Sequence, residues 1–101
     1  MDYRILPPDE MLEARVKLPL SKSISNRLLI INSLAGGDGQ LPELAECEDT
    51  HVLRAALSGP DDTHINIAGA GTAMRFLAAY YAATPGHDIT LDGNERMRQR
   101  P

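Results

Sequence analysis

The side chains best suited to chemistry are Lys22, Ser23 and Arg27, which stand together at the start of a predicted helix. The first turn of a helix leaves backbone N–H groups unpaired and carries a partial positive charge, so it attracts anions. Cations at this position oppose the helix dipole, whereas a sequence built only for stability would have Asp or Glu there. Ser23 and Arg27 are four residues apart and therefore share a helix face. The pattern favours a site for phosphate or carboxylate, and a solvated helix start is the alternative.

A helix from Lys22 to Ala35 is predicted to position these side chains. Ser21 is a typical N-cap, no Pro or Gly interrupts the run, and Gly36 and Gly37 follow where a left-handed C-terminal residue belongs. The remaining faces of the helix are apolar and carry Ile24, Leu28, Leu29, Ile31, Leu34 and Ala35. This is more apolar surface than an exposed helix carries. We therefore expect the helix to be buried and its charged end to line a pocket.

A second candidate anion site is the segment Gly69-Ala70-Gly71-Thr72, between a predicted strand at 64–68 and a predicted helix at 73–83. Glycines let the backbone approach a ligand, and the helix start supplies N–H donors. The segment lacks the third glycine and downstream acid of a dinucleotide site and the Gly-Lys-Ser/Thr ending of a P-loop, which disfavours nucleotide binding. A plain strand-to-helix turn, with Thr72 as the N-cap, is the alternative.

Three arginines, Arg96, Arg98 and Arg100, follow a predicted turn at Gly93. The planar guanidinium suits a carboxylate or phosphate held by two hydrogen bonds. We interpret Arg98 and Arg100 as solvated charges and keep Arg96 as a candidate ligand residue. The three histidines of the chain have no metal-ligand spacing, so no metal site is predicted.

The overall composition limits the classes of protein. With 101 residues, the chain is long enough for one ordinary domain, and its net charge of −4 argues against a nucleic-acid surface. Cys47 is the single cysteine, which excludes an internal disulfide and fits a reducing compartment. No apolar run in the sequence is long enough to span a membrane. We expect a soluble cytoplasmic protein.

The order of elements predicts an α/β (α+β) fold with helices packed on a small mixed sheet. Alternating patterns predict strands at 3–6, 13–18, 64–68 and 88–91, and Asp49 or Thr50 is expected to cap a helix that ends at Ser58. The segments 23–29 and 71–77 both open a helix with small residues and place Arg one turn in. This similarity suggests a repeated βαβ-type unit whose helix starts gather at one end of the sheet.

Taken together, the segments 20–27, 70–75 and 92–101 closely resemble motifs of the N-terminal part of the EPSP synthase (3-phosphoshikimate 1-carboxyvinyltransferase) family, in the same order. The resemblance implies the enolpyruvyl transferase fold in a two-domain protein. Residues 1–20 would be initial strands that belong to the other domain. Residues 21–101 would be the first, truncated part of the N-terminal substrate-binding domain.

The resemblance also implies an activity: transfer of the carboxyvinyl group of phosphoenolpyruvate to shikimate 3-phosphate in chorismate and aromatic amino acid biosynthesis. The family uses no metal or organic cofactor. Lys22 matches a catalytic lysine that contacts both substrates, and Ser23 and Arg27 match residues that hold shikimate 3-phosphate. Matches to the phosphoenolpyruvate contacts are Gly71, Thr72 and Arg96. The acid–base carboxylates of the family lie downstream, so we expect a monomer that needs the remainder of its polypeptide and has no turnover alone.

Two positions depart from the family pattern: Gly69 stands where Asn is usual, and Phe76 where Pro is usual. The interval between the first and second motifs is also shorter than usual. Two alternatives remain open. One is a relative of UDP-N-acetylglucosamine carboxyvinyltransferase, which typically has Lys-Asn where this chain has Lys22-Ser23 and no match to Arg27. The other is a non-catalytic anion-binding α/β module.

Overall fold

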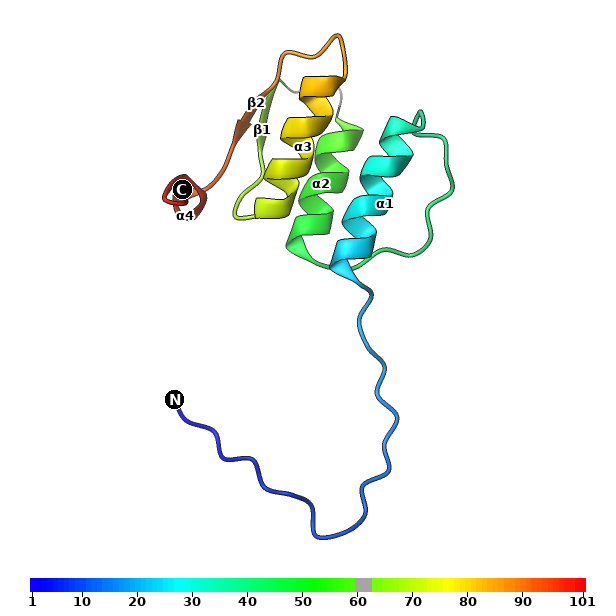
Figure 1. Cartoon of the computed structure of the whole chain (residues 1–101), viewed down its shortest axis with the longest axis vertical. Helices are drawn as coiled ribbons and strands as arrows, with labels where there is room; N and C mark the ends of the chain where they lie inside the picture. The colour runs from blue at the N-terminus through cyan, green and yellow to red at the C-terminus, as the bar shows by residue number, and fades with distance from the viewer. Residues whose placement is uncertain (60–62) are drawn as a thin grey trace.

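The computed structural model describes residues 1–59 and 63–101 (Figure 1). Within these residues, four helices and two strands follow one another as α1 (Lys22–Leu34), α2 (Glu48–Ser58), β1 (His64–Asn66), α3 (Gly71–Ala83), β2 (Thr90–Asp92) and α4 (Glu95–Arg98). The strands β1 and β2 form a two-stranded parallel sheet in which Ile65 is paired with Leu91. The α/β class is therefore compatible with the structure, and β1, α3 and β2 form one βαβ unit. A mixed sheet was expected, but the sheet of the described residues is purely parallel.

Helix α1 begins at Lys22 as predicted and ends at Leu34, one residue before the predicted Ala35. The Ile24 N–H donates to Ser21 Oγ at 3.2 Å, which makes Ser21 the N-cap. At the other end Gly36 and Gly37 have positive φ angles of 104° and 80°. The Gly37 N–H donates to the Asn32 carbonyl at 2.8 Å, which closes the helix as a Schellman motif does.

Helices α2 and α3 begin earlier than predicted. Cys47, and neither Asp49 nor Thr50, occupies the N-cap position of α2, and its side chain makes no capping hydrogen bond. Thr72 is inside α3 and is not its N-cap, because the Met74 N–H already donates to the Ala70 carbonyl at 3.0 Å.

Two C-terminal elements also differ from the prediction. Strand β2 begins at Thr90 and not at residue 88, because Thr90 is the first residue paired with β1. The short helix α4 was not predicted, and its N-cap is Asn94, whose side chain accepts from the Met97 N–H at 3.0 Å.

Residues 1–20 form an extended arm and not the strands expected at 3–6 and 13–18 (Figure 1). Every residue of the arm is exposed, including Tyr3 and Val16. A strand needs a neighbour for its backbone hydrogen bonds, and the sheet of the described residues consists of β1 and β2 alone. The alternating pattern therefore has no partner strand to pair with here.

The core lies between α2, α3 and the sheet. Leu53 of α2, Leu77 of α3 and Ile67 after β1 are fully buried, and Ile65 is 8% exposed, so Ile65 and Ile67 share the buried face as predicted. The Tyr81 hydroxyl adds a hydrogen bond from α3 to the Ala56 carbonyl of α2 at 3.1 Å.

Helix α1 packs against this core on one side only. Its buried residues are Ser25, Asn26 and Leu29, whereas Ile24 and Ile31 are about 60% exposed. The expectation that the whole helix is buried is therefore wrong for its outer face, because no element of the described residues covers that face.

Helices α1, α2 and α3 run in the same direction and begin at the same end of the molecule (Figure 1). Strands β1 and β2 end there too, and α4 follows β2 at that end. The predicted gathering of helix starts at one end of the sheet is thus confirmed. None of the helices in residues 1–59 and 63–101 is long and apolar enough to cross a bilayer.

We predict that the arm and α1 differ strongly in amide hydrogen exchange. Amides of residues 1–20 should exchange at nearly the rate of an unstructured peptide, since no helix or ladder protects them. Amides of residues 25–34 should be protected by the hydrogen bonds of α1. Exchange followed by NMR at each residue checks this, and equal protection of the two segments would contradict the fold described here.

Candidate anion-binding site

The starts of α1 and α2 are joined by an ion pair. Lys22 is the first residue of α1, and its Nζ lies 3.4 Å from Oδ2 of Asp49 in the first turn of α2. The Lys22 side chain is 52% exposed and that of Asp49 19%. An ion pair this exposed contributes at most about 1 kcal/mol to stability. Its clearer effect is to fix the direction of the ammonium group across the two helix starts.

Buried polar side chains beneath this ion pair hold the two helix starts together. Ser25 Oγ donates to the Ser21 carbonyl at 2.7 Å and accepts from the Ala45 N–H at 2.8 Å. Thr50 Oγ1 donates to Asn26 Oδ1 at 2.9 Å, which links α2 to α1 inside the core. Removing one partner of a buried hydrogen bond leaves the other partner unsatisfied, which lowers the stability of the fold. The position of Lys22 therefore depends on side chains that are fully shielded from solvent.

Lys22 also lines a hollow of about 440 Å³ between the arm and the segment before α2. Its other walls are residues 17–20 and 43–47. The charged end of α1 thus borders a pocket, as the sequence predicts. Lys17 is a second lysine in the lining of this hollow, and Glu43 and Glu46 add negative charge to it.

Ser23 and Arg27 lie on the exposed side of α1, one turn apart. Arg27 Nη1 donates to the Ser23 carbonyl at 3.1 Å, so the two residues share a face as predicted. The guanidinium carbon of Arg27 lies 5.8 Å from the centroid of the Phe76 ring on α3. This contact places a cation between α1 and α3.

At the start of α3 the neighbour of Gly71 is Arg100. A Cβ at Gly71 would lie 2.9 Å from Nη1 of Arg100, so a larger residue there would displace the end of this flexible side chain. Thr72 is the next residue, and its Oγ1 lies 3.5 Å from Arg75 Nη2. Arg96 is exposed on α4 and makes no hydrogen bond or ion pair with the described residues. The structure therefore brings Arg100, and not Arg96, to Gly71.

The turns that follow β1 and β2 are joined to each other. The Asn94 N–H donates to the Ala68 carbonyl at 2.9 Å, and the Ala68 N–H donates to Asn66 Oδ1 at 2.8 Å. Ala68 has a positive φ of 52°, which costs a residue with a Cβ about 1–2 kcal/mol. The backbone that leads into Gly71 is thus held in one shape by hydrogen bonds from both turns.

Arg98 is not the solvated charge that the sequence suggested. Its Nη2 and Nε donate to the two carboxylate oxygens of Asp92 at 2.8 and 3.2 Å, and His64 Nε2 lies 3.7 Å from the same carboxylate. The hydrogen bonds from Arg98, followed by the Gly93 N–H, lower the pKa of Asp92, and the same pair raises the pKa of Arg98. This bidentate contact fastens α4 to the end of β2.

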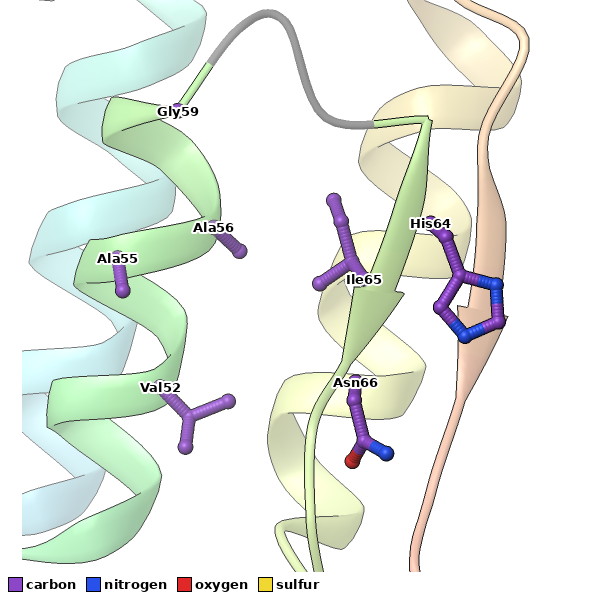
Figure 2. A pocket seen from close by; sticks show the side chains of 7 residues that line it. All are labelled: Val52, Ala55, Ala56, Gly59, His64, Ile65 and Asn66. Atoms are coloured by element: carbon purple, nitrogen blue, oxygen red, sulfur yellow. The ribbon is translucent and has the colours of Figure 1, made fainter.

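A separate hollow of about 230 Å³ lies between α2 and β1. Figure 2 shows Ala56 and Val52 of α2 on one side and Ile65 of β1 directed toward them. His64 and Asn66 complete its edge. None of the predicted site residues lines this hollow, so it is not the anion site indicated by the sequence.

Comparisons with known proteins bear on the identity of these residues. The chain is 51% identical over its whole length to a 3-phosphoshikimate 1-carboxyvinyltransferase of Bacteroides fragilis, of which it covers 24%. It is 36% identical over 96% of its length to the proteins of that name from Rhizobium leguminosarum and Pseudomonas savastanoi, covering 28% of each. No family model matches the chain. No solved structure matches it either.

The resemblance to EPSP synthases is confirmed. It extends over the whole chain and is consistent with the N-terminal part of such a protein. The chain spans about a quarter of the length of the curated relatives that it matches. The alignment with the EPSP synthase of Rhizobium leguminosarum has 119 positions, more than the 101 residues here, so that relative carries inserted residues.

Sequence reasoning missed two residues at the helix starts. Asp49 was considered only as a helix cap, although an acid in the first turn of a neighbouring helix is a natural partner for Lys22. Arg100 was set aside as a solvated charge, and its proximity to Gly71 depends on the unpredicted helix α4. The signal for Arg100 was the glycine itself, which leaves space for a close approach.

We predict that Asp92 makes the stability of the chain depend on pH. Its native pKa is lowered, so the Asp92–Arg98 contact stabilises the fold above the ordinary carboxyl pKa of about 4 and is lost as the pH falls through the native value. Asp92→Asn should therefore lower the melting temperature at pH 7, and the difference from the native chain should shrink toward pH 3. Melting followed by circular dichroism measures this. Asp38→Asn, in an exposed loop, is the control, and a difference that stays constant with pH would contradict the assignment.

Proposed function

We propose that residues 21–101 are the first part of the substrate-binding N-terminal domain of an EPSP synthase and that residues 1–20 supply strands to its other domain. The reaction is transfer of the carboxyvinyl group of phosphoenolpyruvate to shikimate 3-phosphate by a cytoplasmic, monomeric enzyme with the enolpyruvyl transferase fold. The observation that carries the proposal is the common location of the starts of α1 and α3, with Lys22 on one and Gly71 on the other (Figure 1). The 51% identity to an EPSP synthase supports it.

The chemical problem posed by this reaction is the mutual repulsion of its substrates. Two unit negative charges 4 Å apart repel by about 4 kcal/mol at an effective dielectric constant of about 20, and each substrate carries more than one charge. Helix starts and cations gathered at one place offset this repulsion without moving during the reaction. The chain is acidic overall, so its positive charge at the helix starts is a local feature.

Each candidate residue has a role that follows from its place. Lys22, held by Asp49 across two helix starts, would contact both substrates. Ser23 and Arg27 would bind shikimate 3-phosphate, since their exposed groups share one face of α1. Gly71 and Thr72 would bind phosphoenolpyruvate through the free N–H groups of the first turn of α3.

Arg96 would complete the phosphoenolpyruvate site. It is exposed and has no protein partner among the described residues, so its guanidinium is available to an anion. Arg100 already lies beside Gly71 and would add positive charge there.

The reaction protonates the vinyl carbon of phosphoenolpyruvate to a methyl group, and the hydroxyl of shikimate 3-phosphate adds to the resulting cationic carbon with loss of its proton. Phosphate then leaves together with a proton of the methyl group, which restores the double bond. The residues described here would contribute orientation and electrostatic stabilisation. We assign the acid–base groups to polypeptide outside these 101 residues, because the candidate ligand residues offer cations, hydroxyls and backbone N–H donors.

Ser23 and Arg27 favour shikimate 3-phosphate over the alternative of a UDP-amino sugar. The alternative relative typically has Asn at the position of Ser23 and no match to Arg27. A non-catalytic anion-binding module is the remaining alternative, and it differs from the proposal in showing no preference between phosphorylated compounds.

Titration of the chain with each substrate tests the assignment. Shikimate 3-phosphate should shift the amide resonances of Ser23 and Arg27, and phosphoenolpyruvate those of Gly71 and Thr72. Lys22→Met should weaken both interactions about 10- to 100-fold, the effect of removing a charged hydrogen bond of roughly 1.5–3 kcal/mol.

The matched control is Arg54→Met, which removes one positive charge from an exposed position of α2 away from its first turn. Equal loss of affinity in the two variants would indicate a general charge effect and would contradict a site at Lys22. Shifts that are the same for inorganic phosphate and shikimate 3-phosphate would favour the non-catalytic module.

A second expectation concerns turnover. Incubation of the 101-residue chain with both substrates should release phosphate no faster than the substrates do in buffer, because the acid–base groups are assigned elsewhere. Phosphorus NMR measures the release directly. Catalytic release by the purified chain would overturn that assignment.

A further inference from the structure

Arg27 and Phe76 form a contact that bridges α1 and α3 across a groove. The guanidinium carbon of Arg27 is 5.8 Å from the ring centroid of Phe76, which is within the range of a cation–π interaction. Both residues line the groove between the two helices, together with Ile30, Ile31 and Leu34 of α1 and Tyr80 of α3. Arg27 is the one charged residue in that lining.

Most hydrogen-bond donors of the Arg27 guanidinium have no partner among the described residues. A guanidinium has five N–H donors in its plane, and an aromatic ring interacts with the face. One donor of Arg27, on Nη1, is directed to the Ser23 carbonyl. The remaining donors stay available for an anionic oxygen of the ligand while the ring contacts the side chain from the α3 side.

An exposed arginine without such support has many rotamers, and ordering them opposes binding. Arg27 is exposed, whereas Phe76 is partly buried and packs against the core. The core therefore holds the Phe76 ring in place, and contact with the ring restricts the rotamers of the Arg27 side chain. Orientation of Arg27 before the ligand arrives reduces the entropy lost on binding.

We propose that Phe76 is a positioning residue that holds Arg27 ready to bind shikimate 3-phosphate. The inference rests on the proposed function, because it takes Arg27 as a ligand residue for that anion. It assigns a role to a position at which the sequence departs from the usual proline. A phenylalanine whose only role is to fill the groove would not depend on the electron density of its ring.

The test is a series of chains in which Phe76 is replaced by phenylalanines with one, two and five ring fluorines. Fluorination weakens the negative face of the ring stepwise while its size changes little. The dissociation constant for shikimate 3-phosphate, measured by titration, should rise along the series by about two- to fivefold in total. Melting temperatures measured in parallel show whether folding is affected.

Two comparisons separate positioning from packing. In an Arg27→Ala background the fluorinated series should have no further effect on affinity. Phe76→Leu, which keeps an apolar side chain in the groove, should weaken binding to a similar extent as the most fluorinated ring.

The possible failures are distinguishable. If the native chain does not bind shikimate 3-phosphate, both the proposed function and the inference are overturned. If binding depends on Arg27 but is unchanged across the fluorinated series, the proposed function stands and the inference is wrong. A series that lowers affinity equally with and without Arg27 would also overturn the inference.

Discussion

The parallel pairing of β1 with β2 is the constraint on which the arrangement of this chain depends. Two parallel neighbours require a crossover, and α3 supplies it. Since both strands end on the same side, the helices that follow them, α3 and α4, begin on that side. Helices α1 and α2 pack alongside α3 in the same direction, which adds two more helix starts. The positive ends of the helix dipoles are therefore concentrated at one end of the molecule.

Gathering the positive ends of the helix dipoles at one end of the molecule lowers its stability. Binding of an anion at that end would offset this cost. Parallel helix dipoles do not cancel one another, and a cation in the first turn costs roughly 0.3–1 kcal/mol. Asp49 offsets part of the cost by pairing with Lys22. Asn26 and Thr50 secure the helices beneath this pair, although Asn26 Nδ2 has no hydrogen-bond partner among the described residues. A buried amide left half satisfied is a further cost of this arrangement.

The features that the sequence predicted correctly are those that depend on interactions between residues close together in the chain. Ser21 and Gly36 marked the ends of α1 because capping involves only nearby residues. The periodicity of Ile65 and Ile67 predicted the buried face of β1 for the same reason. For the arm and the outer face of α1 the prediction failed. Their apolar patterns indicate burial, whereas the structure shows these side chains exposed.

Contacts between distant residues could not be predicted from local patterns. The pairs Lys22–Asp49 and Arg27–Phe76 join separate helices, and the approach of Arg100 to Gly71 depends on α4. Their positions follow from the packing of the helices and not from spacing along the chain.

A crystal structure of the chain grown with shikimate 3-phosphate tests the central claim most directly. We predict density for shikimate 3-phosphate at the end where α1 and α3 begin, within hydrogen-bond distance of Ser23 and Arg27. Density for the ligand at the opposite end of the helices, or a structure in which Lys22 and Gly71 lie at opposite ends, would contradict the account.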